Sequence, residues 1–540
     1  MNQRDQRSHL LRGGLFRHPF LFTLLIVMMG GLLAACGVDL QNPPRLATAT
    51  AQAAVPPPTR HAPLELAAPT ATPPADDSEA SVLLSPGEVA PPPVEGDGLT
   101  IWINETTPEH EVVLNEIAAE FAERYGVNVA IQLVSPALLP KLANTGVLSG
   151  TLPDLIMHPI EYTAGWVQDG ILDAAAADEV IDRLGRDRFD PAALDLLSVG
   201  GRTAAIPSDG YHQLLLYRAD WFEEMELAAP ETYSTIATAA ERIFDPDAVI
   251  SGLVIPTESN LVTTHQAFEQ IALANRCRLI DEDGEVIILE PVCHEAIEHY
   301  FTTINRFSPS GVQTDTSAAI AFLTGRTGII ITSPAILPDL AELNPLAMPT
   351  CDECEQIEGG INYLAHNTGI ITEIRGPSGS PTAFGNIRSL GITTAANRDL
   401  AAAFAEFWFD EGYARWLAVD SERKVPLQLG TTSEPRKYID TWGTTPFGDS
   451  GLSLMDLYGE DTVARLREGI ASAPRWGLRE GYGALMTRLY DQFVFSIVLQ
   501  EMLSGYFNTE TTLREAYRRT VDLIPNYAFP DRLAEEEITP

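Results

Sequence analysis

The chain has 540 residues, enough for more than one domain, and carries 74 acidic against 35 basic residues, a formal net charge of −39. A nucleic-acid partner is therefore not expected, because phosphate binding requires a basic surface. The acidity also disfavours strongly anionic ligands at long range, although a local arginine could still hold one, and it favours solubility.

The first 35 residues have the features of a signal peptide. Four arginines precede an apolar run at 20–35, which is short for a helix that spans a bilayer in about 20 residues. The sequence Leu33-Ala34-Ala35-Cys36 resembles a bacterial lipobox. This resemblance implies cleavage before Cys36 and acyl chains on that residue, more than one of which gives stable anchoring. The alternative is an uncleaved membrane helix.

Residues 36–97 are predicted to form a tether. The segment is rich in Pro, Ala and Thr and contains few large apolar residues. Such a composition cannot bury enough surface to offset the entropy of ordering. Proline clusters at 56–58 and 91–93 stiffen it locally. We expect the tether to hold a folded domain away from the membrane.

The folded part is expected to begin at about residue 98 with a βαβ unit. LTIWIN at 99–104 predicts a strand, and the next segment places Val113, Ile117 and Phe121 on one face of a helix. A second strand is predicted at 127–133. The pattern predicts an α/β fold with a mostly parallel sheet flanked by helices.

The stretch at 150–173 predicts a turn, a strand, a loop and a helix. Its apolar run at 155–157 is typical of a buried parallel strand. In open α/β sheets, ligands bind just past the carboxyl ends of the strands. His158, Glu161 and Tyr162 are expected at that place.

Four cysteines follow Cys36, and outside the cytoplasm they are expected to be oxidised. Cys277 and Cys293 bracket a predicted hairpin, and Cys351 and Cys354 form a CxxC pair. Three connectivities are open in principle. We expect the two local disulfides rather than a zinc site, because the sequence offers no second CxxC and no paired histidines.

The order of elements from 99 to about 530 resembles that of family 1 extracellular solute-binding proteins, the maltose-binding-protein-like components of ABC importers. The resemblance lies in the lipobox and tether, then LTIWIN (99–104), GTLPDLI (150–156), IPSDGYHQLLLY (206–217), FLTGRTGIIIT (322–332) and GITTAANRD (391–399). It implies a two-lobed periplasmic-binding-protein-like fold, each lobe a mostly parallel sheet flanked by helices. The implied lobes are 98–207 with 335–387, and 208–334 with 388–530, followed by a tail at 531–540.

The same resemblance implies three crossings between the lobes, at 207–210, 332–334 and 388–390. A Pro- or Gly-containing break of this kind also occurs in ordinary loops. If the crossings form a hinge, a ligand in the cleft would close the lobes.

Candidate ligand-binding residues lie at these crossings and at predicted strand ends. Carboxylates accept hydrogen bonds from hydroxyls strongly, and sugars need an apolar platform as well. Trp476 is the expected platform, because Pro474 and Gly477 disfavour a regular helix around it. For Trp476, Tyr211 and His158 the alternative is a place in the core, and for Arg388 it is an ion pair with one of the chain's own acids. The full set is Asn104, Glu105, His158, Glu161, Tyr162, Asp209, Tyr211, Ser333, Arg388 and Trp476.

The resemblance implies a monomeric, lipid-anchored, extracytoplasmic solute receptor of an ABC importer. Its partners would be permease subunits and a small solute, most simply a sugar or oligosaccharide, with no cofactor and no metal. The alternatives are a lipoprotein serving a sensor system, a polyamine or other non-sugar ligand, and a secreted glycoside hydrolase. Catalysis is not expected: His294 and His299 are five residues apart, not the four of a zincin motif. Carboxylates such as Glu161 and Asp209 suit sugar binding as well as hydrolysis.

Overall fold

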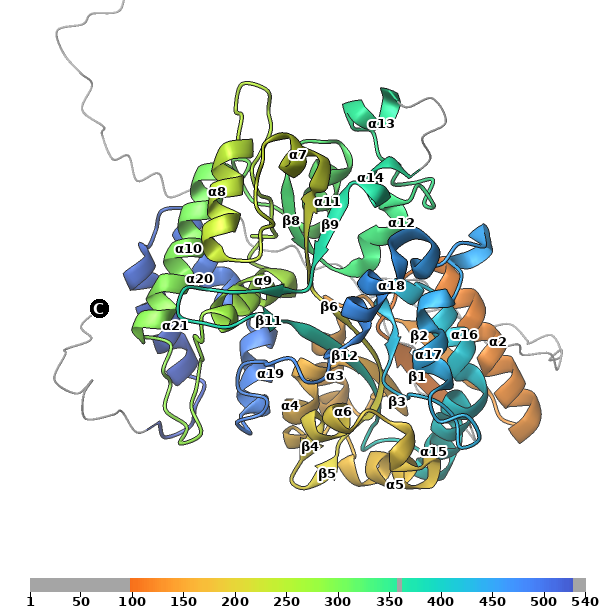
Figure 1. Ribbon diagram of the computed structural model, residues 1–540. Helices are drawn as coiled ribbons and strands as arrows, with labels where there is room; N and C mark the ends of the chain where they lie inside the picture. Colours follow the sequence, from red (N-terminus) through yellow and green to blue (C-terminus); the bar gives the residue numbers. More distant parts are fainter. Residues whose placement is uncertain (1–97, 357–361, 528–540) are drawn as a thin grey trace, which may run out of the picture. The chain divides into compact units, whose positions relative to one another are not determined.

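The computed structural model describes residues 98–356 and 362–527 (Figure 1). The predicted signal peptide, the lipidation residue Cys36, the tether and the tail all lie outside these described residues. Within the described ranges, no helix combines the length and the apolar character needed to cross a membrane.

Six strands form the larger sheet, in the order β13-β6-β12-β3-β1-β2. The three strands predicted at the start of the fold pair in parallel, whereas β12 runs antiparallel to both β3 and β6. β6 therefore points in the same direction as β3. The bounds are β1 Leu99–Ile103, β2 Val129–Leu133, β3 Leu155–Pro159, β6 Ile206–His212, β12 Gly385–Ile392 and β13 Val425–Pro426.

Helices cover both faces of this sheet because successive strand residues point to opposite sides. Ile101 and Leu155 pack with α2, α5, α15 and α16, whereas Trp102 and Ile156 pack with α3 and α4. α2 ends at Gly126, which adopts the left-handed backbone that glycine tolerates (φ 66°). The helices are α2 Pro108–Tyr125, α3 Leu139–Ser149, α4 Thr163–Gln168, α5 Ala174–Leu184, α6 Pro191–Leu196, α15 Arg398–Phe407, α16 Tyr413–Ala418 and α17 Lys437–Thr441.

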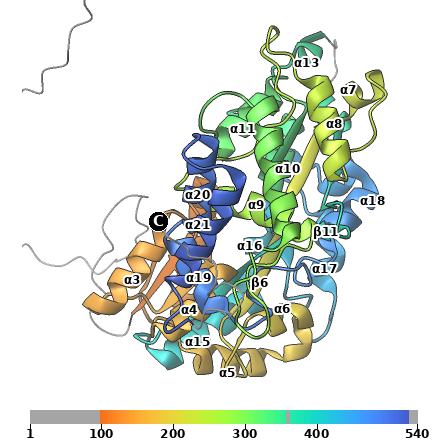
Figure 2. The ribbon, with the colours of Figure 1, turned by 90° about the vertical axis from the view of Figure 1, so that its left-hand side faces the viewer.

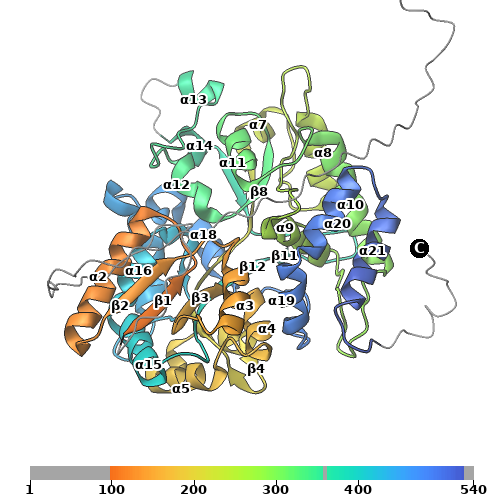
Figure 3. The same cartoon turned by 180° about the vertical axis from the view of Figure 1, so that it is seen from behind.

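A second, three-stranded sheet has the order β8-β7-β9 and is antiparallel throughout. The C-terminal helices α20 and α21 contact α9 and α10 of this lobe, as Figures 2 and 3 show. Its elements are β7 Leu214–Arg218, β8 Ile329–Thr332, β9 Thr368–Ile371, α7 Ala219–Glu224, α8 Tyr233–Ile243, α9 Val262–Ala274, α10 Pro291–Phe307, α11 Asp315–Leu323, α12 Leu337–Leu340, α13 Asp352–Gln356 and α14 Tyr363–His366. The chain ends with α18 Leu454–Arg467, α19 Gly483–Asp491, α20 Val494–Leu503 and α21 Thr509–Val521. Short two-stranded pairs are β4 Ser198–Val199 with β5 Arg202–Thr203, and β10 Glu373–Ile374 with β11 Thr382–Ala383.

At two places a single residue separates strands that belong to different sheets. Gln213 alone separates β6 from β7, and Phe384 alone separates β11 from β12. The backbone N–H of Gln213 donates to the carbonyl oxygen of Phe384 at 3.0 Å, so the two passages run side by side.

Two of the predicted crossings, at 207–210 and 388–390, are wrong. Both segments lie inside β6 and β12, where Arg388 pairs with Asp209 and Ser389 pairs with Pro207. Ser208 is the extra residue of a bulge between these pairs, and a bulge is one of the few places where a sheet accepts proline. Pro207, from which we predicted a break in the strand, therefore marks a bulge within the continuous strand β6.

Strand pairing also differs from the predicted division of the chain into lobes. β9, at 368–371, belongs to the three-stranded sheet, although 335–387 was expected in the first lobe. β12 and β13 belong to the six-stranded sheet, although 388–530 was expected in the second. The chain therefore enters the first lobe at residue 385, whereas the prediction had it leave that lobe at 388. The lobe to which a strand belongs is decided by the strands it pairs with, and the local sequence does not reveal them.

The two predicted disulfides are present. Cys277 is bonded to Cys293, and Cys351 is bonded to Cys354. Between the first pair, Ile280 bridges Val286 as expected for the predicted hairpin.

Candidate functional site

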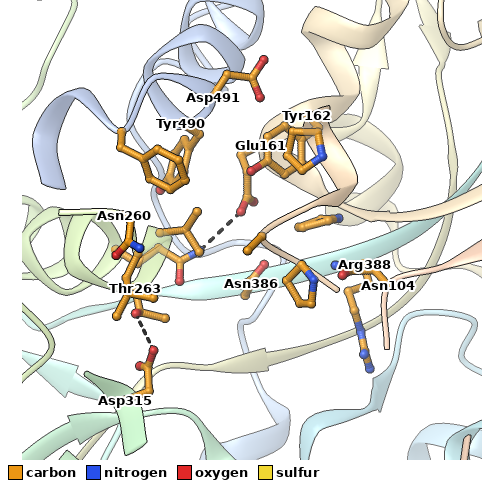
Figure 4. A pocket seen from close by; sticks show the side chains of 18 of the residues that line it. Asn104, Glu161, Tyr162, Asn260, Thr263, Asp315, Asn386, Arg388, Tyr490 and Asp491 are labelled. Atoms are coloured by element: carbon orange, nitrogen blue, oxygen red, sulfur yellow. Dashed lines mark hydrogen bonds between the residues drawn. The ribbon is translucent and has the colours of Figure 1, made fainter. Parts of the chain in front are cut away.

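A cavity of about 300 Å³ opens where one edge of the six-stranded sheet faces helices of the second lobe (Figure 4). The carboxyl ends of β1, β2, β3 and β6 meet at this edge. The amino end of β12 joins them because β12 runs the other way. Residues from separate strands therefore converge on one wall. They include Asn104, Glu105, Glu161, Tyr162, Tyr211, Asn386 and Arg388.

The second lobe supplies the opposite wall. α9 contributes its first turn, α11 its first residue and α19 its last two residues. The residues are Asn260, Leu261, Val262, Thr263, Gln266, Asp315, Tyr490, Asp491 and Phe493. A recess of about 130 Å³ adjoins the cavity, sharing Tyr211, Gln266, Asp315 and Asn386 as walls.

Most of the predicted site residues line this space. Asn104, Glu105, Glu161, Tyr162, Tyr211 and Arg388 line the cavity itself, and Ser333 lines the adjoining recess. The remaining three, His158, Asp209 and Trp476, line neither.

Trp476 is a core residue, and the prediction that it forms the stacking platform is wrong. Its side chain is 1% exposed, and the indole N–H donates to the carbonyl oxygen of Cys277 at 2.9 Å. The ring packs against Phe268 and Phe495. Pro474 and Gly477 do prevent a regular helix here, but the irregular segment turns its aromatic ring into the second lobe.

His158 and Asp209 lie beneath the wall. His158 is fully buried, contacts the Thr163 hydroxyl through Nε2 at 3.1 Å, and lies against Trp166. Burial lowers the pKa of His158 to about 4, so the imidazole is neutral near pH 7. Asp209 is also fully buried and accepts hydrogen bonds from Arg388 and Trp416. Its role is to hold Arg388.

Arg388 joins two carboxylates at the floor of the cavity. Its Nε donates to Asp209 at 2.7 Å, and its Nη1 donates to Glu105. Arg423 donates to Glu105 at 3.3 Å and to Asp420 at 2.6 Å. Burial raises the pKa of Glu105, but Arg423 and Arg388 outweigh it and hold that pKa well below its usual range.

A histidine and a lysine extend this network away from the cavity. His110 accepts a hydrogen bond from the Lys424 ammonium at 2.7 Å through Nε2, and its Nδ1 contacts the Thr107 hydroxyl at 2.6 Å. Burial, followed by the Lys424 charge, lowers the pKa of His110 to about 3. Burial lowers the pKa of Lys424 to about 7.

One group of three among the described residues has the spacing of metal ligands: Glu105, His110 and Asp420, with ligand atoms within 4.8 Å of one another. Both nitrogens of His110 already have partners, and Lys424 and Arg423 already supply positive charge at this place. We infer a structural ion network and no metal site.

Sequence reasoning missed the residues of the second wall, together with Asn386 and Arg423. One local signal was available, because Thr314 and Ser317 form a capping box that places Asp315 at the start of a helix. Nothing local indicates that this helix faces the ends of β1 and β3.

A family model described as bacterial extracellular solute-binding protein matches residues 116–425. The match spans more than half of the chain, and the chain belongs to this family of binding proteins. Membership implies an extracytoplasmic location. The predicted family resemblance is thereby confirmed.

One curated relative is a putative ABC transporter periplasmic-binding protein, YcjN of Escherichia coli strain K12. It is 24% identical over 236 residues, which are 43% of this chain and 54% of the relative. The match thus spans about half of that relative's length.

Solved structures of solute-binding proteins share the fold. A sugar transporter protein of Arthrobacter chlorophenolicus A6 with bound laminaribiose has a TM-score of 0.63 at 13% identity, covering 79% of this chain and 99% of its own. A protein of Thermotoga lettingae TMO bound with α-D-tagatose has a TM-score of 0.61 at 17% identity, covering 79% and 100%. One from Agrobacterium radiobacter K84 in complex with ribitol has 0.60 at 17% identity, covering 80% and 100%. The two-lobed α/β fold predicted from the sequence is confirmed. The prediction of a mostly parallel sheet in each lobe is wrong for the second lobe, whose three strands are antiparallel.

Replacing the buried tryptophan tests its place in the core. We expect Trp476→Ala to lower the free energy of unfolding by roughly 3–5 kcal/mol, because it leaves a large cavity and removes an indole hydrogen bond. Urea unfolding measures the loss. Ligand affinity of the folded variant should stay within about twofold of the parent's. A variant of unchanged stability and strongly reduced affinity would contradict this placement.

The burial of His110 predicts that the stability of the fold decreases in acid. The pKa of His110 is about 3 when folded and 6.5 in its ordinary state, so between these values the unfolded chain binds a proton that the folded chain does not. Stability should therefore fall as pH decreases from about 6.5. His110→Gln should make this fall less steep in urea unfolding at pH 7, 6 and 5, whereas the exposed-residue control His366→Gln should not. Parallel profiles for all three proteins would contradict the assignment.

Proposed function

We propose that this protein is the ligand-binding component of an ABC importer and that it binds a small sugar or polyol in the cavity between its lobes. The observation that carries the proposal is a set of buried polar atoms on the cavity walls without partners among the described residues. They are Oδ1 of Asn104, Oε2 of Glu161, Oδ1 of Asn386 and Oδ1 of Asp491. Buried polar groups normally have hydrogen-bond partners, and a ligand with several hydroxyls would supply them.

The rest of the cavity suits the same ligand class. Aromatic rings of Tyr162, Tyr211, Tyr490 and Phe493 line it beside these polar groups. The first N–H groups of a helix have no partner within the helix, so those at the start of α9 would donate to oxygen atoms of the ligand. A hydroxyl group suits both walls because it can donate a hydrogen bond as well as accept one. The volume of about 300 Å³ lies at the lower end of the usual range for small-molecule sites.

The relatives support transport of such a solute. Similar folds hold tagatose, ribitol and laminaribiose, and YcjN is described as a component of an ABC transporter. The partners would then be permease subunits, and a sensor role remains the alternative for the same site. The hydrolase alternative loses its predicted pair of carboxylates, because Asp209 lies beneath Arg388 and outside the cavity while Glu161 lines it.

We also propose that the two ends of the chain have the roles predicted from the sequence. Residues 1–35 would be a signal peptide, Cys36 would carry lipid, residues 36–97 would form a tether, and residues 531–540 would form a tail. The folded part would act as a monomer at the outer surface of a membrane. Two lobes joined by single-residue passages would close over the ligand.

Ligand binding can be screened by melting temperature. A sugar or polyol that binds only the folded protein should raise it. With the best compound, Asn386→Ala should lose roughly three- to tenfold in affinity, the effect of one hydrogen bond. Asn128→Ala, at an exposed position, should lose nothing. If no sugar or polyol raises the melting temperature, the proposed ligand class is wrong.

Lipidation has a separate test. Cys36→Ser should accumulate as an uncleaved precursor without acyl chains, detectable by mass spectrometry of the membrane fraction. Maturation of this variant to the parent's mass, with lipid attached, would contradict the anchor.

A further inference from the structure

The walls of the cavity hold more negative charge than the chain itself neutralises. We propose that the hydroxylated ligand carries a protonated amine, as an amino sugar or amino polyol does, and that this amine binds the carboxylate of Glu161. The inference deepens the proposed function and rests on it.

The proposed binding partner of the amine is the buried side chain of Glu161. It follows β3 on the 3-10 turn Ile160–Tyr162, and its side chain is 1% exposed. Figure 4 shows the Glu161 side chain directed into the cavity. The Nε2 of Gln266 donates a hydrogen bond to Oε1 of Glu161 at 3.4 Å. Oε2 has no partner within the described ranges. Burial raises the pKa of Glu161, as expected for a carboxylate that lacks a dedicated cation.

The cation whose charge acts on Glu161, Arg475, is already bound elsewhere. Arg475 donates through Nε to Glu269 at 3.1 Å, through Nη1 to the carbonyl oxygen of Gly385 at 3.2 Å, and through Nη2 to the Tyr490 hydroxyl at 3.0 Å. Glu269 is its carboxylate partner. Arg475 therefore attracts Glu161 only at longer range.

Two more carboxylates of the second lobe reach the cavity with neutral partners. Asp315 accepts a hydrogen bond from the Thr263 hydroxyl at 2.8 Å, and Asp491 accepts one from the Asn144 amide at 3.3 Å. Burial raises the pKa of both aspartates. When ionised, they add negative charge to the wall that the second lobe supplies.

The arginines in the walls do not offset this charge. Arg388 is shared by Glu105 and Asp209, and Arg423 by Glu105 and Asp420. With Lys424 beside them, these two guanidiniums are taken up by the acids of the first lobe. The remaining cation lining the cavity is Lys141, whose side chain is exposed on α3. One exposed ammonium at the edge leaves the buried Glu161 without a counter-charge of its own.

A neutral hydroxyl would satisfy the hydrogen-bonding needs of Oε2 but not its charge. An ammonium group supplies three donors and a full positive charge, and charge-assisted hydrogen bonds are about twice as strong as neutral ones. The unpaired acceptors on Asn104 and Asn386 then remain for the ligand's hydroxyls. The walls thus favour one cationic and several hydroxyl groups on the same ligand.

Matched pairs of compounds test the inference by titration calorimetry. The pairs are D-glucosamine with D-glucose, D-galactosamine with D-galactose, and 1-amino-1-deoxy-D-sorbitol with D-sorbitol; spermidine tests an amine without hydroxyls. At least one amine should bind about tenfold or more tightly than its neutral partner. Glu161→Gln keeps the size of the side chain and should weaken that amine roughly 10- to 100-fold, and the neutral partner less than about threefold.

Glu123→Gln makes the same chemical change on the exposed face of α2 and should alter neither affinity. If Glu161→Gln fails to fold, Glu161→Asp retains the charge and should retain the preference for the amine. If sugars or polyols bind but no amine binds more tightly than its neutral partner, or if the amine preference survives Glu161→Gln, the inference is overturned and the proposed function stands. Binding of spermidine alone, lost in Glu161→Gln, would support an ammonium site and contradict a sugar or polyol ligand. Binding of no compound in either set would contradict both.

Discussion

The cavity depends on one buried side chain, Arg388, and on the strand that carries it. β12 is inserted between β3 and β6 in the opposite direction, and its register places Arg388 beside Asp209 and Pro159. The guanidinium then binds Asp209 below it and Glu105 from the loop after β1. Buried charges are tolerated only when they are paired, and removing one partner typically costs about 3–5 kcal/mol. The arginine therefore fixes the positions of three strand ends at once.

This pairing also decides which charges are left for a ligand. Because Arg388 and Arg423 are engaged by acids of the first lobe, neither is available to Glu161 on the same wall. Arg475 is held by Glu269 on α9 and by Tyr490 on α19. The negative charge inside the cavity is thus a consequence of how the structural ion pairs are formed, and not of the overall acidity of the chain.

The sequence predicted the parts of the site that follow from local pattern. An apolar run ending at Met157, followed by Pro159, indicates a strand end, and the rule for α/β sheets then places Glu161 and Tyr162 at the ligand edge. Asn104 and Glu105 were predicted from the resemblance of the first strand to that of the family, in which the loop after this strand faces the ligand. The prediction that His158 contacts the ligand is wrong, because the alternation of side chains along β3 turns His158 into the core beside Trp166.

Long-range pairing was beyond the reach of the sequence. The division into lobes depends on the strand that β9 joins, and the second wall depends on helices hundreds of residues from β1. Trp476 shows the limit most clearly, because a large aromatic in an irregular segment is compatible with a cavity wall and with a core. Of the ring partners that decide between the two, Phe495 follows Trp476 closely on α20, but Phe268 lies on α9, far before it along the chain.

The most direct test of the account is a crystal structure of the protein with the compound that binds most tightly in the calorimetric series. We expect the compound to lie between the lobes, with a nitrogen or oxygen atom within hydrogen-bond distance of Glu161 and another beside Asn386. A compound bound elsewhere, with the space between Glu161, Asn386 and Asp315 filled only by water, would contradict it.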